Sequence, residues 1–154
     1  MEPHEAVDAV IADLRDHRIT GDGSGLFTAT RHIGLLCHLT ARMATDAEHQ
    51  PAPNIAGLPT AQALGQTTGH LGRAIAHYTQ ALAPLIALAK PGTQATLQKQ
   101  LDAIEQHSRL RVHLDDAGKA LAAARACLGV LRRPATPSTT TAVPVPAPTV
   151  RRRS

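Results

Sequence analysis

Histidine is the residue type best able to do chemistry in this chain, because nine of its 154 residues are histidines. Imidazole nitrogens bind zinc and exchange protons near neutral pH, so a metal site and an acid–base catalyst come first. The spacing favours neither. No His-x-x-x-His or Glu-x-x-His pair occurs, and His70 and His77 stand two helical turns apart, too far to hold one ion unaided. We therefore predict solvated histidines, with no metal, no cofactor and no small-molecule substrate.

His107 differs from the other histidines because it falls at a core-type position of a predicted helix, with His113 beside it. We expect a half-buried imidazole whose polar atoms are satisfied, and whose protonation near pH 6 would loosen the helices locally. Asp115 and Asp116 fall outside the apolar stripe of the same helix. These two carboxylates are expected to lie on a solvated face.

The two cysteines, Cys37 and Cys127, could act as thiol nucleophiles beside His38 and His113. Nucleophilic catalysis also needs an oxyanion-binding group and an orienting acid, and no recognisable spacing supplies either. We expect both thiols to be free and buried in the core, as in proteins of a reducing compartment. No catalytic residue is predicted, and a cytoplasmic location is expected.

A glycine-rich segment at 21–25 resembles loops that cradle phosphate in front of a helix. No strand precedes it, however, and neither a Lys-Ser/Thr pair nor a ribose-binding acid follows at the required spacing. The segment therefore predicts a plain interhelical turn, with Asp22 or Ser24 capping the next helix.

The net charge of +4 comes from five arginines near the C-terminus: Arg132, Arg133, Arg151, Arg152 and Arg153. Without them, eleven basic residues face twelve acidic ones, so the rest of the chain predicts no basic nucleic-acid-binding face. The five charges could contact nucleic-acid phosphates or an acidic protein partner. No aromatic residue lies among them to stack on bases, and a merely solubilising tail is the competing interpretation.

The elements that would position these residues are predicted to be helices. Apolar residues make up 43% of the chain but aromatic ones only 1%, so the core must consist of Leu, Ile, Val and Ala, which suits an all-α fold. Periodicity and turn signals predict one domain over 1–133, with helices at about 5–17, 26–48, 60–89 and 93–131. Residues 134–154 are rich in Pro and Thr and are predicted to form a disordered tail.

Two heptad stripes face each other across a turn at 90–93. One stripe is Leu64, Thr68, Leu71, Ile75, Tyr78, Leu82, Leu85 and Ala89, and the other is Leu110, Leu114, Ala117, Leu121, Ala124, Leu128 and Leu131. Small or apolar neighbours make the apolar face wider than the seam of a two-stranded coiled coil. We therefore predict an antiparallel four-helix bundle in which the two long helices form a hairpin.

Two features interrupt the long helices. Pro84 removes one backbone hydrogen bond and should kink or split the third helix. In the fourth helix, for which Thr93 is the expected N-cap, Leu97, Leu101 and Ile104 form a stripe that is offset from the one starting at Leu110. We expect different helices to cover these two halves.

Gly65, Gly69 and Gly72 lie inside the third predicted helix, where each glycine costs roughly 1 kcal/mol relative to alanine. Close approach of another helix over this patch is the preferred explanation, and a partly frayed segment is the alternative. The patch could also receive a helix of a partner protein.

No catalytic constellation accompanies these apolar stripes, so a non-catalytic helical module that binds another protein or itself is the leading hypothesis. An accessory protein that contacts nucleic acid through its arginine-ended tail is the alternative, and a metal protein or enzyme is the third class. The first residues lack the features of a signal peptide, and the longest apolar run, at 81–89, is too short to cross a bilayer. No membrane partner is therefore expected.

Overall fold

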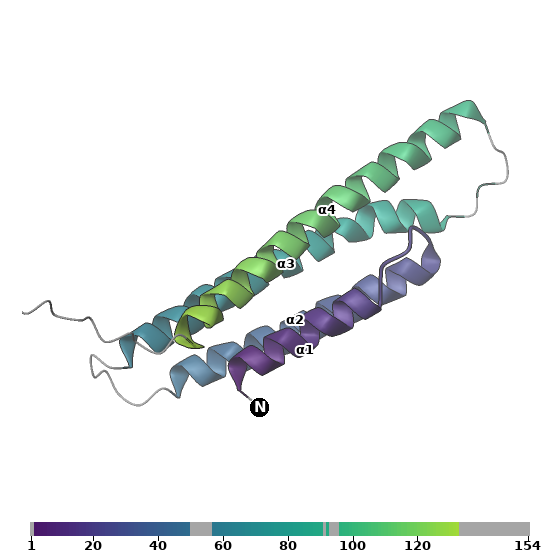
Figure 1. Cartoon of the computed structure of the whole chain (residues 1–154). Coiled ribbons are helices and arrows are strands. Elements are labelled where there is room, and N and C mark those ends of the chain that lie inside the picture. Colours follow the sequence, from purple (N-terminus) through teal and green to yellow (C-terminus); the bar gives the residue numbers. More distant parts are fainter. Residues whose placement is uncertain (1, 50–56, 91, 93–95, 133–154) are drawn as a thin grey trace, which may run out of the picture.

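The computed structural model describes residues 2–49, 57–90, 92 and 96–132, and the described residues form helices (Figure 1). The elements are α1 (Pro3–Asp16), α2 (Gly23–Glu48), α3 (Leu58–Ala89), α4 (Leu97–Gly129) and a short 3₁₀ turn, η1 (Val130–Arg132). The all-α, antiparallel four-helix architecture is confirmed. The tail predicted at 134–154 lies outside the described residues.

Three of the four helices begin earlier than predicted, and α4 begins later. In α1, Pro3 occupies the first turn and the Glu2 backbone N–H donates to the Glu5 carboxylate at 2.9 Å. At α4, the Lys99 backbone N–H donates to the Thr96 hydroxyl at 3.3 Å, so the prediction of a start at 93 is wrong. A side-chain oxygen that satisfies a free N–H fixes where a helix begins, and Thr96 supplies it for α4, whereas the predicted N-cap Thr93 lies outside the described residues.

The helices are arranged in a ring in which each one packs against two neighbours. α3 packs against α2 and α4, and α1 packs against the same two helices from the other side. Within the described chain, the diagonal pairs α1 with α3 and α2 with α4 have no Cα atoms within 8 Å of each other. Figure 1 shows the two hairpins, α1–α2 and α3–α4, lying along each other.

The buried face of α3 is made of two neighbouring heptad positions. Leucines at 64, 71 and 85 and Tyr78 are buried, and so are the flanking Thr67, Ala74 and Ala81. The other column of the predicted stripe, Thr68, Ile75 and Leu82, is only half-buried. The apolar face is thus broader than a two-stranded seam, as predicted, because α3 contacts two helices at once.

Pro84 does not split α3. The helix continues through this residue to Ala89, and the proline ring is buried. The predicted stripe of α4 is also buried or half-buried from Leu110 to Leu128, whereas its last member, Leu131, is exposed in η1. The core therefore ends at Leu128, one turn before the predicted end of the stripe.

Candidate functional site

A buried histidine, His32, lies between α2 and α3. The His32 side chain is only 1% exposed, and its ring meets the Tyr78 ring edge-to-face, with centroids 5.6 Å apart and an interplanar angle of 88°. Neither ring nitrogen of His32 has a hydrogen-bond partner. Burial lowers the pKa of His32 and raises the pKa of Tyr78, so both side chains are held in their neutral forms.

Sequence reasoning missed His32, although a signal for it was present. Ala29, Leu36 and Met43 lie on the buried face of α2, and His32 stands three residues after the first and four before the second. That spacing places the imidazole in the same buried column. The residue type, which is usually exposed, hid the pattern.

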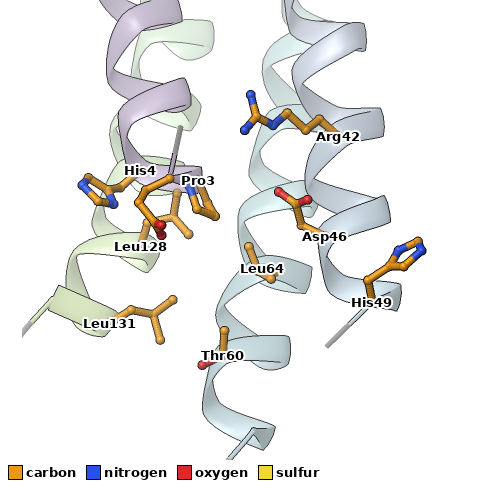
Figure 2. Close-up of a pocket in the computed structure, with 10 residues that line it drawn as sticks. Pro3, His4, Arg42, Asp46, His49, Thr60, Leu64, Leu128 and Leu131 are labelled. Carbon is orange, nitrogen blue, oxygen red and sulfur yellow. The ribbon is translucent and has the colours of Figure 1, made fainter. Parts of the chain in front are cut away.

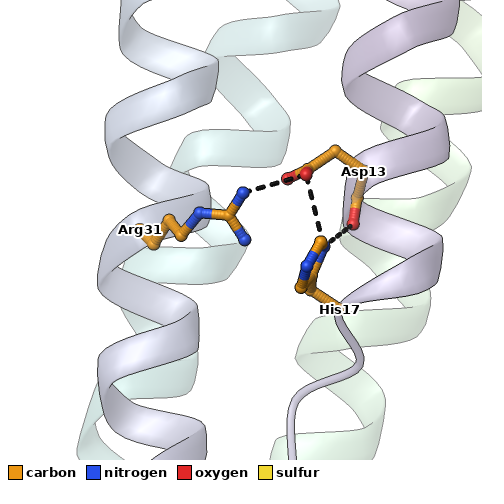
Figure 3. A network of polar contacts seen from close by, with 3 residues as sticks. All are labelled: Asp13, His17 and Arg31. Atoms are coloured by element: carbon orange, nitrogen blue, oxygen red, sulfur yellow. Dashed lines mark hydrogen bonds and ion pairs between the residues drawn. The ribbon is translucent and has the colours of Figure 1, made fainter.

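A polar network joins α1 to α2 close to this histidine (Figure 3). The Arg31 guanidinium donates to the Asp13 carboxylate at 2.9 Å, and His17 Nδ1 lies 3.2 Å from the same oxygen. His17 Nδ1 also contacts the Asp13 backbone carbonyl at 2.9 Å. The second Asp13 oxygen is buried without a partner. The network joins the two helices. Burial is the largest effect on the pKa of His32 and lowers it, whereas Asp13 raises this pKa and the charges of Arg31 and His17 lower it.

A cavity of about 530 Å³ opens at the end of the bundle where α1, α2, α3 and α4 approach one another (Figure 2). Leu64, Leu128 and Leu131 form its apolar lining, and the polar residues around it are Glu2, His4, Arg42, Asp46, His49 and Thr60. Figure 2 shows the rings of His4 and His49 pointing to opposite sides rather than toward Asp46. These side chains therefore do not converge on one reacting or metal-binding point.

The other histidines are spread along the bundle. His107 is exposed rather than half-buried, and its ring lies against the Gly21 backbone, so that prediction is wrong. His70 contacts the Arg73 guanidinium at 2.7 Å, and Nδ1 of His77 is buried without a partner. Over residues 2–49, 57–90 and 96–132, no three His, Cys, Asp or Glu side chains gather closely enough to hold a metal ion.

The prediction that both cysteines are buried in the core is wrong. Cys37 is exposed and Cys127 is only partly buried, and both thiols are free. Cys37 directly follows the buried Leu36, and one residue turns a helix by about 100°, which carries the thiol out of the apolar face.

Only Gly21 and Asp22 of the glycine-rich segment lie in the turn between α1 and α2, because α2 already begins at Gly23; the predicted capping by Asp22 is confirmed. The Asp22 carboxylate caps α2 by accepting from the Gly25 backbone N–H at 2.9 Å and from the Thr20 hydroxyl at 2.7 Å. The hydrogen bond from Thr20, followed by that from Gly25, lowers the pKa of Asp22. Gly25 packs against the Thr20 carbonyl and leaves no room for a side chain.

Within the part of the chain that the structure describes, no helix covers the glycines of α3. Gly65, Gly69 and Gly72 are exposed, and a Cβ added to any of them would meet no atom within 4 Å. Close packing inside the chain is therefore the wrong explanation, and the patch stays a predicted surface for a partner helix. Of the predicted arginine contacts, Arg132 ends η1, while Arg133, Arg151, Arg152 and Arg153 lie outside the described residues.

No family model, curated protein or solved structure matches this chain.

α4 presents apolar side chains to solvent on the side opposite its core face. Leu97 is 73% exposed, Leu101 52%, Ile104 65% and Val112 54%. Leu97 and the buried Ala117 are separated by 20 positions, or about 200° of rotation at roughly 100° per residue. The offset noticed in the sequence is therefore a change of face. The expectation that another helix covers this half is wrong for the described chain.

This exposed face continues along the whole of α4 at alternating spacings of four and three residues. We call it the outer stripe: Leu97, Leu101, Ile104, Ser108, Arg111, Asp115, Gly118, Ala122, Arg125 and Gly129, all of which are exposed. Figure 1 shows the first turns of α4 diverging from the end of α3. A cavity of about 570 Å³, lined in part by Leu88, Lys99 and Ala103, separates the helices there. The apolar end of the outer stripe thus stands clear of the bundle.

No helix in the described part of the chain is long and apolar enough to span a membrane. Contiguous exposed apolar side chains on one helix face, as at Leu97, Leu101 and Ile104, are typical of interaction surfaces.

Proposed function

We propose that this protein is a non-catalytic helical module that binds protein through the apolar end of the outer stripe of α4. The observation that carries the proposal is the exposure of Leu97, Leu101 and Ile104 on one face of one helix, each by more than half of its side-chain surface. Fully burying a leucine or isoleucine side chain is worth about 1.5–3 kcal/mol. Three such side chains supply a strong driving force for association.

The spacing of these side chains supports a helical partner. Positions 97, 101 and 104 follow the alternation of four and three residues that lets one helix pack along another. The scattered histidines and thiols of the described chain give no competing support for catalysis, since their side chains do not converge.

The test compares two variants of the full chain. L101E/I104E places two charges in the apolar end of the outer stripe, and F27E places a charge at Phe27, an exposed apolar side chain in α2. Circular dichroism should show native helicity in both, since all three positions are exposed. The wild type and both variants are cross-linked in cells of the source organism, and the attached proteins, including further copies of the chain, are compared. We expect the proteins attached to the wild type to be absent with L101E/I104E and present with F27E. The same cross-linked set in all three chains would refute the proposal.

A further inference from the structure

The composition of the outer stripe changes in three steps along α4. Its first three positions are large and apolar: Leu97, Leu101 and Ile104. Its centre carries two opposite charges, Arg111 and Asp115. Its last third is mostly small: Gly118, Ala122 and Gly129. Large side chains at one end and small ones at the other would face each other if two copies of this stripe packed in opposite directions. The opposite charges at the centre would then also face each other.

We propose that the outer stripe binds the outer stripe of a second copy of this chain, with the two α4 helices antiparallel about a two-fold axis level with residue 113. This inference rests on the proposed function and names the partner. With that axis, Leu97 stands opposite Gly129 of the other copy, and Ile104 stands opposite Ala122. Large side chains of one copy fill the space that small residues leave on the other.

The central charges also match in this arrangement. Arg111 of each copy stands opposite Asp115 of the other, which gives two reciprocal ion pairs. Neither residue forms an ion pair within the described chain. On one helix, a base that precedes an acid by four residues is the less favourable orientation for an ion pair. Asp115 acts electrostatically on Lys119, but the ion pair of Lys119 is with Asp116, so Arg111 and Asp115 remain available for contacts between copies.

One larger residue, Arg125, interrupts the small end of the outer stripe and faces Leu101 of the second copy. Its guanidinium is drawn toward α1, where Nε lies 2.6 Å from the Asp8 carboxylate. The neighbouring Ala126 is exposed and presents only a methyl group. Because the Arg125 guanidinium is held by Asp8 of α1, it leaves room on α4 for Leu101 of the second copy.

The charges select the antiparallel orientation over the parallel one. Parallel pairing would set Arg111 against Arg111 and Asp115 against Asp115, and it would leave the glycines facing each other across a gap. Like charges that face each other across an interface suppress that arrangement. α4 has 33 residues and is about 50 Å long, and its ten stripe positions are fewer than the roughly 20–30 residues of a standard interface side. We expect a dimer with a dissociation constant of about micromolar order.

Charge exchange tests the pairing. In a dimer of R111E, each introduced glutamate faces Asp115 of the other copy, and in a dimer of D115R each introduced arginine faces Arg111. Sedimentation equilibrium of the full chain from low to high micromolar concentration should show that each variant alone dimerises about tenfold or more weakly than the wild type. Mixing the two variants should restore association, because in the mixed dimer both contacts join opposite charges. S24E, at an exposed position of α2, is the matched control.

Three results separate the outcomes. Loss in each single variant and recovery in the mixture support the antiparallel dimer. A wild-type dimer that the charge variants leave unchanged, or that the mixture does not recover, overturns it. A wild type that stays monomeric at every concentration also overturns the antiparallel dimer. In that case the proposed function stands only if a different protein is cross-linked to the wild type and is lost with L101E/I104E. If no cross-linked protein depends on those residues, the proposed function fails as well.

Discussion

Replacing His32 with phenylalanine should remove a specific pH dependence from the stability of the bundle. The imidazole is 1% exposed and both of its nitrogens lack partners, and burial lowers its pKa. The unfolded chain, with an ordinary histidine pKa of about 6.5, therefore takes up the proton first as the pH falls. The stability that depends on neutral His32 is complete above about pH 6.5 and is lost as the pH falls from there toward the folded-state pKa.

The size of the effect follows from one proton. Between the two pKa values, the free energy of unfolding of the wild type should fall by as much as about 1.4 kcal/mol per pH unit relative to H32F. Phenylalanine keeps the edge-to-face contact with Tyr78 and removes the two unpartnered nitrogens. At pH 8, the gain from removing an unsatisfied buried polar group, about 1–3 kcal/mol, should exceed the strain of the slightly larger ring.

Urea unfolding followed by circular dichroism at pH 8, 7, 6 and 5 measures both quantities. The other histidines and the carboxylates contribute equally to both proteins, so the difference between the two curves isolates His32. H38F is the matched control, because His38 is exposed on the same helix. Identical pH dependence in the wild type and H32F would refute the assignment of a buried, neutral imidazole.

Three further predictions concern the core, the α3 glycines and the tail. L71A should lower the free energy of unfolding by about 2–5 kcal/mol in urea unfolding, because Leu71 is fully buried, whereas a fall below about 1 kcal/mol would show that the site is loosely packed. G69A should raise it by about 1 kcal/mol in the same assay, since the added methyl meets no atom within 4 Å, and a destabilised variant would show that a neighbour covers this face. Deleting residues 134–154, with their three terminal arginines, should reduce any salt-sensitive binding to duplex DNA in a titration at low ionic strength; undiminished binding would exclude the arginine tail as the contact.

The helical fold could be predicted from sequence because its signals are local. A composition that contains one tyrosine, one phenylalanine and no tryptophan favoured helices, and two sustained heptad stripes correctly indicated the broad face of α3. The cap at Asp22 was predictable for the same reason, since a side-chain acceptor next to a glycine-rich turn acts within three residues.

The surface could not be predicted as well, because periodicity tells which residues share a face and not which face another helix covers. Leu97 and Leu110 both looked like core positions, yet only the second is buried. Gly69 was expected beneath a helix and faces solvent instead. His32 was missed for a different reason. Its spacing from Ala29 and Leu36 is that of a core residue, but histidine is a residue type that is rarely buried.

The contact between His32 and Tyr78 also makes the protein a natural single-site reporter. The chain has one tyrosine and no tryptophan, so its absorbance near 280 nm, and the fluorescence excited there, come almost entirely from a ring buried between α2 and α3. A near-ultraviolet signal therefore follows the packing around this one ring, while far-ultraviolet ellipticity follows all four helices. Without any added label, comparing the two signals during unfolding would reveal whether the hairpins separate before their helices melt.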